Sequence, residues 1–333
     1  MSTANETGEP ARVSPAVADL SAVGINAEAS PASKEAAVPA GPSLPDKVAR
    51  KMSRRRFAIP RSLRTPLAII GMIIIVVWVA VIAFAPLLEP HDPLDQSGPR
   101  LASPGGDYWF GTDTLGRDIF SRVIAASRVS IPSSIALVVI SSALGCFIGA
   151  MAGYFGGRID EIFMRLTDLV FAFPSTILAM VISAALGPSI QNAIIAVVLV
   201  SWPTYARLVR SLVLGLRNSE FVIVGRLLGR SSFASLFKDI LPNILPHIFV
   251  LMFVDLGDCL LTLSGLSFLG LGATPPTPEW GQMVSEGVLR MTSWWLAFFP
   301  GLAIFTVVIA ENFVGDAVRD WFDRSYSAGR QGE

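Results

Sequence analysis

Long uncharged segments alternate with polar connections along most of this chain. Uncharged segments run from 67 to 88, 129 to 157, 169 to 206 and 291 to 310, and a further apolar segment, which contains two aspartates, runs from 244 to 271. At about 1.5 Å per residue, a helix of about 20 residues crosses a hydrocarbon layer roughly 30 Å thick. The pattern therefore predicts a bundle of membrane-spanning helices, with the first span at 67–88.

The segment from 169 to 206 is too long for one span. Its residues 186–192, LGPSIQN, supply a turn near the middle. We therefore predict two helices there, at 169–186 and 191–209, which brings the count to six spans with both chain ends on one side. The expected fold class is an all-α membrane protein.

The region before the first span divides into two parts. Residues 1–46 are rich in Ala, Pro, Ser and Glu without an apolar period, and we expect a disordered cytoplasmic tail. A basic juxtamembrane segment follows at 47–66. Its SRRRFA superficially matches a twin-arginine export signal, but such signals lie at the very N-terminus and have a shorter apolar core. We interpret it as a basic flank that keeps the N-terminus inside.

The placement of lysine and arginine orients the bundle. The outer connections hold the following arginines: Arg100, Arg117, Arg122, Arg128 and Arg290. The inner connections hold most of the others, and cytoplasmic connections are enriched in Lys and Arg. We therefore predict an N-in, C-in topology with an extracytoplasmic loop at 89–128, spans two to six within 129–316, and a cytoplasmic tail at 317–333.

Composition agrees with a membrane protein. Hydrophobic residues make up 52% of the 333 residues and charged residues 16%, which is too apolar for a soluble domain. The formal net charge is zero, so we expect no nucleic-acid partner. Cys146 and Cys259 lie in apolar runs without metal-type spacing, and we expect buried thiols and no metal site.

The connection between the fourth and fifth spans, from 207 to 240, is much longer than a helix hairpin needs. Its apolar residues recur at helical spacing at Phe221, Val224, Leu227 and Leu228. Pro242 is expected to end this segment and to start the next helix. Three interpretations stay open: a helix at the lipid interface, a gate, or a docking element for a cytoplasmic partner.

Two features of the spans and loops have a structural explanation. Gly145, Gly149 and Gly153 are four residues apart on one face of the second span, which predicts the close approach of another helix. The motifs GTDTLGRD and RIDEIFMRLTD contain paired acids but no nearby histidine, nucleophile or metal-ligand spacing. We therefore assign no catalytic residue.

Six segments occur in the order and spacing of one family. They are FGTDTLGRDIFSRVIAASRVSI, AGYFGGRIDEIFMRLTDLVFAFPS, VLVSWPTYARLVRS, EFVIVGRLLGRSSFASLFKDILPN, LSGLSFLGLGATPPTPEWGQMVSEG and FPGLAIFTVVIAENFVGDAVRD. Over residues 60–326, the chain resembles the C-type inner-membrane permease subunit of dipeptide, oligopeptide and nickel ABC importers. The resemblance implies the type I ABC importer permease fold in a bacterial plasma membrane, in contact with membrane lipid.

The resemblance also implies partners. They are a second homologous permease, two ATP-binding subunits or domains, and an extracytoplasmic substrate-binding protein. A Walker A loop needs Gly-Lys, and none of the four lysines follows a glycine. We therefore expect a non-enzymatic chain without a bound cofactor, with ATP and Mg used by partner subunits. Peptide is the favoured substrate, because the family mostly transports peptides. The alternatives are nickel or another small solute and, less favoured, ion-coupled secondary transport.

In the resembled family the cytoplasmic connection between the fourth and fifth spans is the coupling loop, here 207–242. The family pattern is Glu-Ala-Ala, a glycine four residues on, and a later Ile-Leu-Pro. This chain has the glycine at Gly229 and the Ile-Leu-Pro at 240–242, but Ile223, Val224 and Gly225 replace Glu-Ala-Ala. The residues implied to couple to the ATPase are Glu220, Phe221, Val224, Gly225, Gly229, Phe233, Leu236, Ile240, Leu241 and Pro242. Without the glutamate, we expect a more apolar contact.

Three carboxylates lie in the predicted spans: Asp255 and Asp258 in the fifth, and Glu311 in the sixth. Insertion of an ionised carboxylate at mid-membrane costs about 2.5–3.5 kcal/mol, so each must face a partner, the bundle interior or water. Asp255 and Asp258 are three residues apart and share a helix face. Two interpretations stay open: this face lines the translocation path for a cation such as a peptide ammonium group, or the pair is protonated or bonded at a subunit interface.

Overall fold

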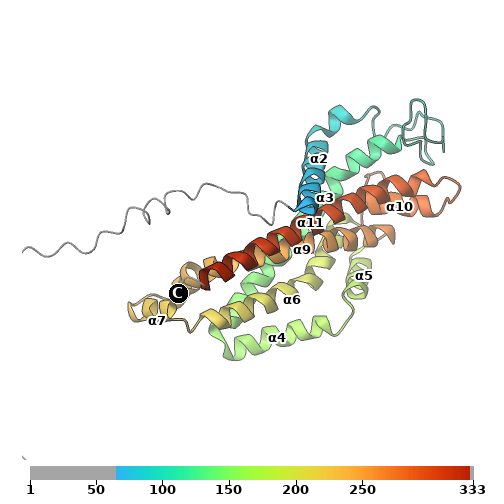
Figure 1. The fold of residues 1–333 in the computed structure, drawn as a ribbon. Coiled ribbons are helices and arrows are strands. Elements are labelled where there is room, and N and C mark those ends of the chain that lie inside the picture. Colours follow the sequence, from blue (N-terminus) through green and yellow to red (C-terminus); the bar gives the residue numbers. More distant parts are fainter. Residues whose placement is uncertain (1–64, 331–333) are drawn as a thin grey trace, which may run out of the picture. The chain divides into compact units, whose positions relative to one another are not determined.

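The computed structural model describes residues 65–330, with side chains described as far as Trp321. Its regular elements are helices (Figure 1). The part of the chain that the structure describes contains no strand beyond isolated bridges between Gly105 and Tyr108 and between Thr112 and Asp118. The predicted all-α fold is therefore confirmed. The tail predicted at 1–46 and nearly all of the basic segment lie outside the described residues.

The described helices follow one another along the chain with short connections, except after α2 and α9. They are α2 (Pro66–Leu88), α3 (Ile119–Phe155), α4 (Gly157–Phe171), α5 (Ser175–Leu186), α6 (Ile190–Leu216), α7 (Glu220–Leu227), α8 (Ser232–Ser235), the π-helical η2 (Leu236–Ile240), α9 (Leu241–Phe268), α10 (Trp280–Val288) and α11 (Trp295–Arg330). Five stretches are long and apolar enough to cross a membrane, and α4 with α5 makes up to six if the bent pair counts as one span. The inside-outside orientation stays a prediction.

The single helix predicted at 169–186 is wrong. Helix α4 ends at Phe171, α5 begins at Ser175, and the two axes differ by 91°. Figure 1 shows this bend between the two green helices. Pro174 directly precedes α5, and proline lacks the backbone N–H that a continuing helix needs and disfavours a helical residue before it.

Three helices extend beyond the apolar runs that predicted them. Helix α3 begins at Ile119, so the predicted loop 89–128 ends earlier than expected. Asp118 starts this helix, because its carboxylate accepts a hydrogen bond from the backbone N–H of Ser121 at 2.9 Å. Helix α6 continues to Leu216, and α11 continues to Arg330 through most of the predicted tail. Hydropathy marks lipid exposure, whereas caps and hydrogen bonds set the helix ends.

Helix α3 packs most extensively against α6, and three glycines lie at their contact. A Cβ atom added to Gly145 would lie 2.4 Å from the carbonyl oxygen of Trp202, and one added to Gly149 would lie 2.4 Å from that of Ala206. Gly153 meets α6 similarly on the next turn. Because no side chain fits there, the two backbones approach closely, as small-residue motifs allow in membranes.

Helices α9 and α11 form a second pair, and α2 packs mainly on α11. Within the described residues of α2, the buried ones are Ala68, Gly71 and Ala85. Most of its large apolar side chains are exposed. Since the helix is apolar on all sides, this exposure places α2 in contact with lipid.

Replacing Gly149 with alanine should destabilise the protein, because the new Cβ would clash with the backbone of α6. Overpacking of this kind costs about 1–3 kcal/mol and should lower the midpoint of thermal unfolding in detergent. Gly215→Ala on α6 is the matched control, since its Cβ would meet no described atom within 4 Å. It should be neutral or stabilising by up to about 1 kcal/mol. Equal midpoints for the two variants would contradict the close contact.

Candidate functional site

The connection between α6 and α9 forms a folded element, which we name the inner segment (217–240). Val222 of α7 and Leu236 and Ile240 of η2 are fully buried. They pack with Tyr205 and Val209 of α6 in one apolar cluster. The inner segment is therefore anchored to the bundle and is not a free loop.

The predicted coupling residues divide into two groups. Glu220, Phe221, Val224, Gly229, Phe233 and Pro242 are exposed, and Leu241 is partly buried. Gly225, Leu236 and Ile240 are buried inside the segment, so in this conformation they maintain its shape and offer no surface to a partner. Their assignment to ATPase coupling stays a prediction.

The most exposed apolar side chains of the inner segment are Leu227 and Leu228. They are 82% and 83% exposed and form the end of α7. The amphipathic pattern included both leucines, but it did not show that they would be the outermost. They form an apolar tip on an anchored helix, and we name them the α7 tip.

Gly229 reverses the chain after the α7 tip. Its φ of +82° lies in the left-handed region that favours glycine. Its N–H donates to the carbonyl of Arg226 at 2.9 Å, and the N–H of Arg230 donates to the carbonyl of Gly225 at 3.1 Å. Ser231 then caps α8 through its side chain. The glycine is therefore required by the turn.

Pro242 lies in the first turn of α9, as expected. It does not end the preceding segment, because the helical run from 232 to 268 is continuous. The backbone N–H of Leu241 donates to the carbonyl of Leu236, five residues back, in the π-helical segment η2. A proline is tolerated in a first turn, where its missing N–H leaves no bond unmade.

The two aspartates of α9 lie in different surroundings. Asp255 is partly buried and accepts a hydrogen bond from the Tyr205 hydroxyl of α6 at 2.7 Å. Asp258 is exposed on the surface of this chain. Asp255 is therefore hydrogen-bonded within the bundle, whereas the carboxylate of Asp258 needs a partner or water to solvate it.

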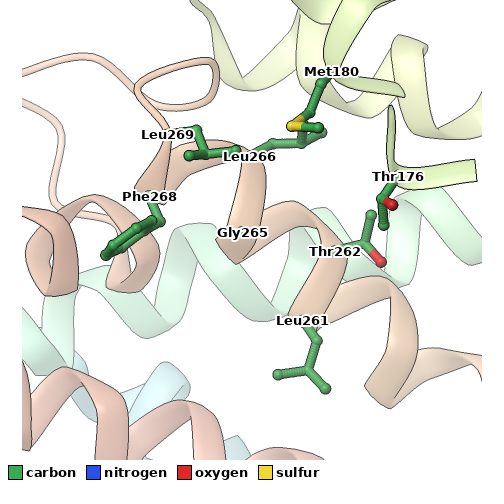
Figure 2. Close-up of a pocket in the computed structure, with 8 residues that line it drawn as sticks. All are labelled: Thr176, Met180, Leu261, Thr262, Gly265, Leu266, Phe268 and Leu269. Atoms are coloured by element: carbon green, nitrogen blue, oxygen red, sulfur yellow. The ribbon is translucent and has the colours of Figure 1, made fainter. Parts of the chain in front are cut away.

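A hollow of about 410 Å³ lies between α5 and the C-terminal half of α9 (Figure 2). Its lining residues are Thr176, Met180, Leu261, Thr262, Gly265, Leu266, Phe268 and Leu269. In Figure 2 the side chains of Thr176 and Thr262 point toward the same space. Asp258, Thr262, Gly265 and Leu269 follow at helical spacing. The exposed aspartate is thus on the helix face that lines the hollow.

Glu311 is also buried in the bundle, at 8% exposure. Within the residues described, its Oε2 atom has no hydrogen-bond partner. A Cβ on Gly257 of α9 would lie 3.7 Å from this oxygen, so the missing side chain leaves room for the carboxyl group. Glu311 faces the interior of the bundle, as expected from the free-energy cost of placing a carboxylate in hydrocarbon.

The outer loop folds into a buried polar cluster. Arg117 lies 2.5 Å from Asp113 and 3.8 Å from Glu286 of α10, and Arg122 lies 3.7 Å from Asp113. The expectation that no histidine lies near GTDTLGRD is wrong, because His91 Nδ1 is 3.7 Å from Asp118. Asp118 nevertheless has a structural role, because it caps α3. The charged contacts of this cluster join the loop after α2 to α3 and α10.

The acids of RIDEIFMRLTD also have structural partners. Asp160 forms an ion pair with Arg210, and Asp168 lies 2.5 Å from Arg207. Both arginines belong to α6, so the pairs tie α4 to α6 across the bend. A search of the described residues finds no group of three or more metal-ligating side chains.

Sequence comparison identifies the family. Residues 145–328 match the binding-protein-dependent transport system inner membrane component family. Residues 53–104 match the N-terminal TM domain of oligopeptide transport permease C. The chain belongs to the binding-protein-dependent inner-membrane component family, as its motifs predicted. It is a multi-pass inner-membrane permease of an ABC importer.

The names of individual relatives refer to different substrates. The nickel transport system permease protein NikC of Escherichia coli (strain K12) is 44% identical over 238 residues, 70% of this chain and 85% of that protein. The dipeptide transport system permease protein DppC of Alkalihalophilus pseudofirmus is 40% identical over 270 residues, 80% and 89% of the two chains. A chain of the MetNI methionine ABC transporter in inward-facing conformations has a TM-score of 0.45 and 17% identity, covering 58% of this chain and 94% of that one.

Glu279 gives the start of α10 a pH dependence. It is fully buried and caps α10, with its carboxylate accepting hydrogen bonds from the N–H groups of Gly281 and Gln282. Burial raises the pKa of the Glu279 carboxyl above its ordinary value, and these hydrogen bonds offset only part of that rise. The free energy of unfolding is therefore highest below the unfolded-state pKa and falls as pH rises through the folded-state pKa.

Glu279→Gln should remove this slope while keeping one acceptor oxygen for the α10 N-terminus. Between about pH 4 and about pH 7, the unfolding midpoint of the variant should fall less than that of the wild type. Asp107→Asn, at an exposed position in the loop between α2 and α3, is the control and should retain the wild-type slope. Parallel slopes for wild type and Glu279→Gln would show that this carboxyl does not titrate on unfolding.

Proposed function

We propose that this chain is the permease subunit of a peptide importer and that the α7 tip docks on a cytoplasmic ATPase. The observation that carries the proposal is the α7 tip itself, two leucines more than four-fifths exposed on a helix anchored to α6. An exposed apolar tip on a fixed scaffold is suited to insertion into a partner groove. The apolar Ile223 and Val224 nearby agree with a contact of low polarity.

A second homologous permease completes the path in this proposal. Asp258 is exposed in a span, and an ionised carboxylate facing lipid is unfavourable by several kcal/mol. The hollow between α5 and α9 is open on the same helix face. A second subunit against this face would shield Asp258 from lipid and enclose the path between the two chains.

A peptide fits the chemistry of that face. The hollow is mainly apolar with the hydroxyls of Thr176 and Thr262, which suits side chains and amide groups, and Asp258 suits an ammonium group. Nickel import is the alternative, supported by the name of the relative NikC. The solute carried by the extracytoplasmic binding protein of this importer, identified by mass spectrometry and metal analysis, decides between the two.

In mechanical terms, closure of the ATPases on ATP would move α7 and rock the spans between inward and outward openings. The binding protein would deliver substrate at the outer face, where α10 and the outer loop lie. In this proposal the N-terminus and C-terminus are cytoplasmic, and ATP and Mg act on the ATPase subunits. Uptake by this chain alone in liposomes would instead establish a secondary transporter.

The double variant Leu227→Asp/Leu228→Asp should release the ATPase subunits without unfolding the permease. Burial of one leucine contributes about 1.5–3 kcal/mol, so loss of both should weaken binding by at least about tenfold. The measurement is the ATPase content of the complex purified through a tag on this chain. Leu289→Asp, at an equally exposed leucine outside the inner segment (84%), should retain full ATPase content. Full retention by the double variant would exclude the α7 tip as the docking surface.

Asp258→Asn should slow peptide uptake by about tenfold, the equivalent of about 1.4 kcal/mol of lost attraction for an ammonium group. The assay is uptake by the reconstituted importer with its binding protein. Asp255→Asn should have a smaller effect, because the amide oxygen still accepts from Tyr205. If both variants together leave assembly and uptake unchanged, Asp258 does not line the path.

A further inference from the structure

An ion pair joins the turn after α7 to the π-helical segment. Arg230 Nη1 donates to Asp239 Oδ1, although the residues lie in different parts of the inner segment. The Asp239 side chain is 13% exposed and that of Arg230 is 44% exposed. The pair is therefore partly shielded from water, and it closes the inner segment on itself.

Helix α7 contacts this pair at Gly225. A Cβ there would lie 3.5 Å from Asp239 Oδ2 and 3.8 Å from Arg230 Cδ. The backbone N–H of Arg230 also donates to the carbonyl of Gly225 at 3.1 Å. Three elements thus meet at one point: the end of α7, the turn, and η2.

The η2 segment departs from α-helical geometry within the run 232–268. Its hydrogen bonds follow the π pattern, which is rare and frequently found at functional sites in helices. It continues directly into α9, the helix that carries Asp255 and Asp258. A force on α7 that reaches Asp239 therefore acts at the base of α9.

We propose that Arg230 and Asp239 are a positioning pair that transmits movement of α7 to α9, which rests on the proposed docking of the α7 tip. The apolar contacts of Val222, Leu236 and Ile240 hold the segment on α6, but they are non-directional. The ion pair supplies a directed link between α7 and η2. Its loss uncouples ATP hydrolysis from transport without releasing the ATPase.

The pair has a second, separable effect on stability. Asp239 Oδ2 is buried without a hydrogen-bond partner among the described residues, so the carboxylate depends on Arg230 for compensation. Removing the cation alone leaves an unpaired, mostly buried charge, whereas removing both charges does not. Stability and coupling should therefore respond differently to single and double variants.

The experiment uses the complete importer in proteoliposomes and measures substrate uptake per ATP hydrolysed, the unfolding midpoint, and ATPase content. Arg230→Ala should lower uptake per ATP by about tenfold and lower the midpoint. Arg230→Ala/Asp239→Asn should recover the midpoint but remain uncoupled. Arg230→Lys, which keeps the cation, should retain most of the uptake per ATP. Arg165→Ala breaks an exposed pair with Glu161 within α4 and should match the wild type.

If the double variant recovers both the unfolding midpoint and the uptake per ATP, the pair only compensates a buried charge. That result would overturn the proposal. Wild-type uptake per ATP in Arg230→Ala would overturn it equally. If Arg230→Ala does not fold, Asp239→Asn, which leaves no buried charge, gives the same uncoupling readout. Failure of the wild-type complex to contain ATPase is a different result, which rejects the proposed docking itself.

Discussion

The close contact between α3 and α6 determines where the other functional parts of this permease lie. In a membrane, helices are not driven together by exclusion from water, so close backbone approach and dispersion must hold them. Gly149 allows that approach because it has no side chain to clash with the backbone of Ala206. Helix α6 then provides Tyr205 for Asp255, arginines for α4, and the apolar seat of the inner segment.

The two ends of α3 use opposite chemistry. At its outer end, Asp113, Arg117 and Arg122 form a buried charged cluster that joins the outer loop to α10. At its inner end, Ala150 and Tyr154 join the apolar cluster beneath the inner segment. Charged contacts are directional and fix a loop in one arrangement, whereas apolar contacts allow small sliding.

Local patterns in the sequence predicted the spans and the glycine face, because hydropathy and spacing are properties of one segment. They did not predict the bend before Pro174 as a change of direction, because a proline permits a break in a helix without setting the angle between its two parts. The apolar pattern of 221–228 could not show that Val222 is covered and Leu227 is not. The different surroundings of Asp255 and Asp258 likewise depend on Tyr205, which is distant in the chain.

The sparse burial of α2 has a consequence for biosynthesis. This helix is the first span to be made, yet its main packing partner is α11, the last. Gly71 meets the carbonyl of Ala310 there, where an added Cβ would lie 2.9 Å from the oxygen. During synthesis α3 can pack on α2 first, but the larger part of the packing surface of α2 stays in lipid until α11 is made, which its uncharged surface permits. Its docking on α11 is a late event that brings the two ends of the membrane domain together.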